Sequence, residues 1–179
     1  MSLTQPAQRL QRVLLLARLD ALSLGLVAAP AALVALATGD RMGAAVGAGV
    51  TLCGVAEWQG RARLLRRQIS GIAWLCCAQL LCLLLILTYA WNLAQLVDPA
   101  HLLALLPGFT RQQLAELFPD PDALAALMLG MQRAVAGALA LVSLLYQGAM
   151  AFYYLRSAPL ARNLFAEPPV LAPGPLPPH

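Results

Sequence analysis

Four stretches of this chain, each of 17 or more residues, are apolar enough to cross a lipid bilayer. They cover residues 21–38, 42–58, 71–96 and 134–155, and the last lies in a longer helix predicted to begin near Pro121. A transmembrane helix needs about 20 mostly apolar residues, because the hydrocarbon core is about 30 Å thick. Only 11% of the residues are charged, against roughly 25% in a soluble domain. The sequence therefore predicts an all-α integral membrane protein.

The connections between these segments predict an antiparallel four-helix transmembrane bundle. In the short stretch 38–42, Gly39 suits the left-handed position that ends a helix, so the first two segments should form a hairpin. Pro30 should kink the first helix without ending it, because neighbouring helices can satisfy the freed carbonyl. We expect residues 1–165 to form one membrane domain. Six prolines in residues 166–179 predict an extended, disordered cytoplasmic tail.

The distribution of arginine predicts the orientation. The chain has twelve arginines and no lysine, and nine of them fall on one side of the predicted membrane. These nine are Arg9, Arg12, Arg18, Arg61, Arg63, Arg66, Arg67, Arg156 and Arg162. The positive-inside rule then places both termini and the loop 59–70 in the cytoplasm, in a membrane of the bacterial inner-membrane type. Aromatic residues should mark the two interfaces, with Trp58, Trp74, Tyr153 and Tyr154 on the cytoplasmic side and Tyr89 and Trp91 opposite.

The outer connection between the third and fourth segments, residues 97–122, predicts short amphipathic helices. One should begin at Asp98 and Pro99, and a second at Thr110, where Gln113 completes a capping-box pattern. Asp120 and Pro121 should begin the last long helix. We expect the short helices to lie on the outer membrane surface or to cover that end of the bundle.

The N-terminus also resembles a secretory signal, with a basic region, an apolar run and the stretch Ala35-Leu36-Ala37. The basic region is long and the apolar run leads directly into a turn, so retention of the first segment is favoured. Cleavage stays an open alternative, because it would leave the orientation of the rest unchanged.

The most concentrated charge lies in the stretch EWQGRARLLRRQIS (57–70), which contains Arg61, Arg63, Arg66 and Arg67. On a helical wheel the last three arginines share one face, which predicts a short amphipathic helix at the inner headgroup level. These arginines are interpreted as a topology anchor. Recognition of anionic lipid headgroups is the alternative, and nucleic acid is excluded because no stacking aromatic residues are interleaved.

Polar residues inside the third and fourth segments predict contacts between helices. Gln79 and Gln147 should lie at matching depth and near each other inside the bundle. Gln147 and Ser143 belong to a stripe of small and polar residues at spacings of three and four. The stripe consists of Ala136, Ala140, Ser143, Gln147, Ala151 and Tyr154. An alternative is that the two glutamines line the path of a transported solute.

Three further features have a packing interpretation and a functional one. The Gly43-x-x-x-Gly47 spacing favours contact within the first hairpin over dimerisation. Glu57 is expected to pair with Arg61 four residues on, and its alternative is a proton- or ion-carrying acid. The cysteines, Cys53, Cys76, Cys77 and Cys82, are expected to act as small apolar residues, with a metal or redox site as the alternative.

The sequence carries no recognisable catalytic motif and no histidine inside a span, so neither an enzyme nor a cofactor is predicted. The favoured function is a structural or accessory membrane protein, whose partners are the lipid bilayer and either a second copy or another membrane protein. The alternative is a small channel or transporter for a small or lipophilic solute.

Overall fold

The computed structural model is all-helical and describes residues 5–95, 107–118 and 120–166. The helices are α1 (Gln5–Ala37), α2 (Arg41–Leu65), α3 (Ser70–Gln95), α5 (Gly108–Leu117) and α6 (Pro121–Ala166), and these ranges contain no strand. In the described part of the chain, three helices are long and apolar enough to cross a membrane, namely α1 from Gln8 onward, α3 and α6. The glycine-rich α2 is not among them.

The turn between α1 and α2 forms as the sequence predicts. Gly39 has a φ of 81°, in the left-handed region that favours glycine. The Asp40 backbone N–H donates to the Ala35 carbonyl at 2.8 Å, and the Gly39 N–H donates to Leu36. These two bonds are the Schellman pattern that closes a helix. The Asp40 carboxylate accepts the Gly43 N–H at 2.8 Å and caps α2, while α1 continues through Pro30.

The turn between α2 and α3 uses the same pattern with an arginine in place of glycine. Arg67 has a φ of 58°, and the Gln68 N–H donates to the Arg63 carbonyl at 2.9 Å. A left-handed conformation costs a non-glycine residue roughly 1–2 kcal/mol. The predicted amphipathic helix with Arg63, Arg66 and Arg67 on one face is therefore wrong. Arg63 lies in the last turn of α2, and Arg66 and Arg67 form the turn that follows.

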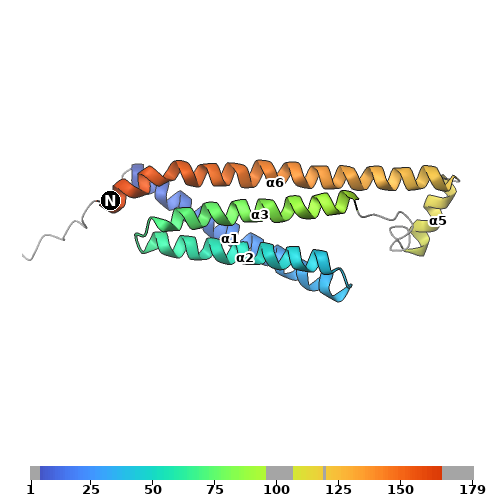
Figure 1. The fold of residues 1–179 in the computed structure, drawn as a ribbon, viewed down its shortest axis with the longest axis horizontal. Helices are drawn as coiled ribbons and strands as arrows, with labels where there is room; N and C mark the ends of the chain where they lie inside the picture. Colours follow the sequence, from blue (N-terminus) through green and yellow to red (C-terminus); the bar gives the residue numbers. More distant parts are fainter. Residues whose placement is uncertain (1–4, 96–106, 119, 167–179) are drawn as a thin grey trace, which may run out of the picture.

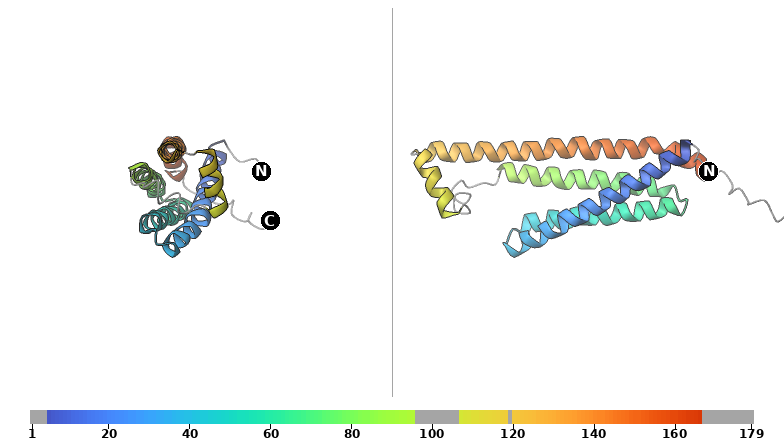
Figure 2. Two further views of the ribbon diagram at one scale, coloured as in Figure 1. Left: turned by 90° about the vertical axis from the view of Figure 1, so that its right-hand side faces the viewer. Right: turned by 180° about the vertical axis from the view of Figure 1, so that it is seen from behind.

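The long helices α1, α2, α3 and α6 lie alongside one another, with contacts between α1 and α2, α2 and α3, α3 and α6, and α1 and α6 (Figure 1). α6 runs the length of the molecule with α3 beside it, and α1 crosses α2 obliquely, as the view from behind shows (Figure 2). The start of α1, the α2–α3 turn and the end of α6 lie at the same end of the molecule. This end, called the arginine-rich end below, brings together the three segments that hold the nine arginines counted above.

Glycines allow α2 to approach both of its neighbours closely. A Cβ atom placed on Gly47 would lie 2.8 Å from the Ala32 Cβ of α1, and one on Gly71 of α3 would lie 2.5 Å from the Gly60 carbonyl oxygen of α2. Gly47 thus contacts α1 within the first hairpin, as the sequence favours. Small residues of this kind are typical of helix contacts in lipid.

The outer connection is described only in its second half. α5 begins at Gly108 after Pro107 and has no side-chain cap bond, so the predicted Thr110 cap is wrong. Proline already fixes the extended conformation that precedes a helix. α6 begins at Pro121, where the Asp120 side chain accepts the Asp122 N–H at 3.0 Å. The predicted helix at 98–106 and the tail at 167–179 lie outside the described residues.

Candidate functional site

The most unusual feature of the interior is a group of polar side chains at one level of the long helices. It consists of Asp20 on α1, Glu57 on α2, Gln79 on α3, and Ser143, Tyr146 and Gln147 on α6, and is called the polar layer below. Asp20, Glu57 and Gln79 are 4%, 0% and 1% exposed, and Ser143 and Gln147 are also buried. Tyr146 is about half exposed and reaches inward through its hydroxyl group.

One amide joins two carboxyl groups at the centre of the polar layer. Gln79 Nε2 donates to Asp20 Oδ2 at 2.5 Å and also to Glu57 Oε1. The Tyr146 hydroxyl donates to the other Asp20 oxygen, Oδ1, at 2.9 Å. An amide nitrogen carries two hydrogens, so Gln79 can serve both carboxyl groups at once. These three bonds connect α1, α2, α3 and α6.

The polar layer lies between two apolar clusters. On one side, toward the arginine-rich end, are Val13, Ala17, Leu64, Ile72, Leu75, Cys76, Tyr154 and Ala161. On the other side are Ala28, Val50, Cys53 and Cys82. On α1, α2 and α3 the polar residue falls between members of these clusters in the sequence, so apolar packing separates the layer from both ends. Hydrogen bonds are electrostatically stronger in such surroundings than in water.

Several polar atoms of this region have no hydrogen-bond partner within the described residues. They are Glu57 Oε2, Gln79 Oε1, Gln147 Oε1 and the Tyr154 hydroxyl. Gln147 Nε2 donates to Cys82 Sγ at 3.4 Å, one helical turn along α3 from Gln79. In this part of the chain, both carboxyl groups are bonded by neutral groups and neither pairs with an arginine. The two carboxyl groups thus lie beside the same amide in an apolar interior, where burying a polar group is costly unless it is hydrogen-bonded.

The three polar residues predicted inside the spans, Gln79, Ser143 and Gln147, are all buried. Gln79 and Gln147, predicted to lie near each other, form no hydrogen bond with each other within the described residues. Gln79 bonds to the carboxyl groups of α1 and α2, whereas Gln147 bonds to a thiol. Both hydrogens of the Gln79 amide nitrogen are thus used by carboxyl oxygens of α1 and α2, which leaves none for a second amide.

Asp20 is absent from the predicted site residues because it directly precedes Ala21, where the first predicted span begins. The helical periodicity in fact extends further back, since Val13, Ala17 and Asp20 follow one another at spacings of four and three on the buried face. Glu57 was expected to pair with Arg61. Instead the Arg61 guanidinium lies over the Trp58 ring, 5.3 Å from its centroid, and Glu57 is fully buried beside Gln79.

Tyr154 was expected at the cytoplasmic interface and is instead completely buried in the first apolar cluster. Its neighbour Tyr153 is half-buried. Ala136, Ser143, Gln147, Ala151 and Tyr154 are all on the buried face of α6, so the predicted stripe does continue to Tyr154. Consecutive residues of a helix point about 100° apart, which separates the two tyrosines.

Three of the four arginines near the α2–α3 turn contact aromatic rings. Arg61 lies over Trp58, Arg63 over Trp74 at 4.3 Å, and Arg67 over Phe165 at 5.9 Å. Such cation–π contacts contribute about 0.5–1 kcal/mol at exposed sites.

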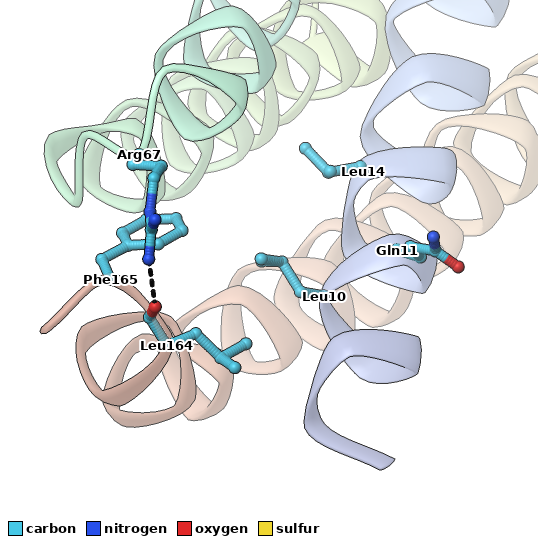
Figure 3. Close-up of a pocket in the computed structure, with 6 residues that line it drawn as sticks. All are labelled: Leu10, Gln11, Leu14, Arg67, Leu164 and Phe165. Carbon is cyan, nitrogen blue, oxygen red and sulfur yellow. Dashed lines mark hydrogen bonds between the residues drawn. The ribbon is translucent and has the colours of Figure 1, made fainter. Parts of the chain in front are cut away.

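Arg67 also donates from Nη2 to the Leu164 carbonyl at 2.6 Å and so ties the α2–α3 turn to the end of α6 (Figure 3). This contact borders an open pocket of about 290 Å³, which Leu10, Gln11 and Leu14 of α1 also line. The guanidinium group of Arg67 thus takes part in packing within the protein.

All four cysteines are free thiols; Cys53, Cys76 and Cys82 are buried and Cys77 is exposed. Within the described residues, no three His, Cys, Asp or Glu side chains are grouped so that they could hold a metal ion. Comparison with protein-family models, curated proteins and solved structures finds no match to this chain.

Proposed function

We propose that this protein is a non-enzymatic, four-span integral membrane protein with a structural or accessory role, and that the polar layer fixes the packing of its helices. The observation that carries this proposal is that one connected set of hydrogen bonds takes a side chain from each of the four long helices. A bond between helices in lipid contributes about 0.6–2 kcal/mol, and it also specifies which faces meet.

The distribution of exposed residues supports insertion in a membrane. Large apolar side chains on α1, α3 and α6 face outward, among them Leu26, Val27, Leu84, Val142 and Phe152, each 61% exposed or more. The interior meanwhile contains two carboxyl groups and two amides. In water such surfaces promote association, whereas lipid accommodates outward leucines and disfavours outward charge.

We also propose that α2 crosses the membrane, although its hydropathy is lower than that of its neighbours. Its 25 residues extend about 37 Å at 1.5 Å per residue, enough for the hydrocarbon core. Glycine lowers its mean hydropathy but permits the close contacts with α1 and α3 described above. Both termini would then lie in the cytoplasm, at the arginine-rich end.

The second candidate is a proton-coupled carrier of a small solute. It is favoured by the two buried carboxyl groups, because an ionisable residue inside a membrane often marks a proton or ion path. Asp20 accepts two hydrogen bonds and Glu57 only one. The two acids therefore differ in their hydrogen bonds, and the unbonded second oxygen of Glu57 makes this acid the one to test.

Reconstitution with the conservative variant Glu57→Gln separates the two candidates. The structural role predicts that wild-type vesicles, with a pH-sensitive dye inside, leak protons no faster than protein-free vesicles across an imposed pH gradient. It also predicts that Glu57→Gln folds with stability within about 1 kcal/mol of wild type, since glutamine has nearly the same size and its side-chain oxygen can still accept the hydrogen bond from Gln79.

Proton flux that requires the wild-type protein and is lost in Glu57→Gln would contradict the structural role and favour the carrier. Gln59→Glu, on the exposed side of α2, is the matched control. This substitution changes the charge of α2 two residues from Glu57, but at a position outside the polar layer. The proton flux of the Gln59→Glu variant should therefore equal that of wild type.

A further inference from the structure

We propose that a groove between α1 and α6 at the arginine-rich end binds a phosphate-bearing anion, which the position of the groove assigns to the headgroup of an anionic lipid. The groove has a volume of about 400 Å³, and it is lined by Arg9, Arg12, Tyr153, Arg156, Ser157 and Leu160. None of these residues belongs to the polar layer or to the segment 61–67 that ends α2 and forms the turn to α3.

Helical spacing directs the two walls of the groove toward each other. Arg9 and Arg12 are three residues apart and share a face of α1. The α6 residues at positions 153, 156, 157 and 160 follow the spacing of three, four and seven that forms one helix face. Val13 of α1 and Tyr154 of α6 belong to the same buried cluster, so the two helices are held in place directly beside the groove.

The chemistry of the lining fits a phosphate group. Guanidinium groups bind phosphate oxygens in a bidentate manner, and here three of them approach from two helices. The Ser157 hydroxyl donates to the Tyr153 carbonyl at 2.8 Å, so binding of an anion depends on the arginines. Residues 5–19 and 150–166 contain no acidic residue that could compete for them.

These arginines are better placed for a ligand than the four at the end of α2 and in the turn that follows it. Arg61, Arg63 and Arg67 already contact aromatic rings of the protein. Arg9, Arg12 and Arg156 are exposed, and no ion pair joins them to a carboxylate within the described residues.

Two features of the groove favour a lipid as the source of the phosphate. Arg156 follows directly on Leu155, the predicted end of the fourth span, where headgroups would lie. Tyr153 and Leu160 add apolar surface beside the arginines, suited to the glycerol and upper acyl chain of a lipid.

Native mass spectrometry of the detergent-purified protein tests this inference. Phosphatidylglycerol is titrated against wild type and against the triple variant Arg9→Gln, Arg12→Gln, Arg156→Gln, with phosphatidylcholine as the zwitterionic probe. Wild type should bind phosphatidylglycerol at least tenfold more tightly than phosphatidylcholine, and the triple variant should lose that preference. The triple variant Arg9→Lys, Arg12→Lys, Arg156→Lys should retain part of the preference for phosphatidylglycerol, because its positive charge is kept. The preference should be weaker than in wild type, because lysine lacks the planar guanidinium group that binds two phosphate oxygens at once.

The matched control is the triple variant Arg18→Gln, Arg66→Gln, Arg162→Gln, which removes the same charge from exposed arginines outside the groove. Its affinity for phosphatidylglycerol should stay within twofold of wild type. Inorganic phosphate is the second probe. If inorganic phosphate binds in the absence of lipid, and the triple variant at Arg9, Arg12 and Arg156 loses this binding, the groove is an anion site and its ligand is free phosphate. Equal losses in both triple variants, or no loss in either, would overturn the proposal, provided that both variants keep the wild-type helical content.

Discussion

Replacing Gly71 with alanine is expected to destabilise the protein by about 2–3 kcal/mol, because the added methyl group would collide with backbone atoms. A Cβ at this position would lie 2.5 Å from the Gly60 carbonyl oxygen and 2.9 Å from the Leu64 nitrogen. Neither atom can move without separating α2 from α3. The measurement is thermal unfolding in detergent, followed by circular dichroism.

Gly137→Ala is the matched control for Gly71→Ala. A Cβ on Gly137 of α6 would have no neighbour within 4 Å, and alanine is favoured over glycine in a helix by about 0.5–1 kcal/mol. The two substitutions should therefore change the stability in opposite directions. Equal effects would show that the close contact of α2 and α3 does not contribute to the fold.

Replacing Gln79 with leucine is expected to cost about 3 kcal/mol, through loss of the donor that joins the two carboxyl groups. Asp20 Oδ2 and Glu57 Oε1 would both lose their bonds to Nε2, and a buried acceptor without a donor costs about 1–3 kcal/mol. The side chains are similar in size, so packing should change little. Unfolding by denaturing detergent, titrated into the mild-detergent state, measures the loss.

Gln59→Leu provides the comparison for Gln79→Leu, because it makes the same chemical change at an exposed position of α2. Its effect should stay within about 0.5 kcal/mol. In the double variant Asp20→Asn, Glu57→Leu, the further loss of stability caused by Gln79→Leu should be smaller. The Gln79 amide then has an acceptor on α1 but none at position 57 of α2. A cost for Gln79→Leu no larger than that for Gln59→Leu would show that the polar layer does not hold the helices together.

Periodicity and turn chemistry predict much of this fold, because both depend on nearby residues. The left-handed Gly39, the start of α6 at Pro121 and the buried stripe of α6 follow from local spacing. The partners of Gln79 do not, because they come from α1 and α2, 59 and 22 residues away along the chain. Only the packing of the helices brings Asp20 and Glu57 to the same amide.

The contacts of the arginines also depend on residues that are distant in the sequence, so they could not be predicted from local spacing. The sequence identifies the cluster 61–67 as the most basic stretch, yet its side chains contact rings on α2, α3 and α6. The groove that gathers Arg9, Arg12 and Arg156 joins residues from opposite ends of the chain. Charge density along the sequence is therefore a poorer guide to an anion site than charge density at one end of the folded helices.

Cysteine labelling at the two ends of α2 tests whether this helix crosses the membrane, as the proposed four-span topology requires. In a variant with the four native cysteines replaced by alanine, single cysteines are introduced as Thr38→Cys and Gln68→Cys, both at exposed turn positions. We expect a membrane-impermeant maleimide to label Thr38→Cys on intact cells and Gln68→Cys only in inverted vesicles. Labelling of both positions from the same side would show that α2 does not cross the membrane and that the four-span topology is wrong.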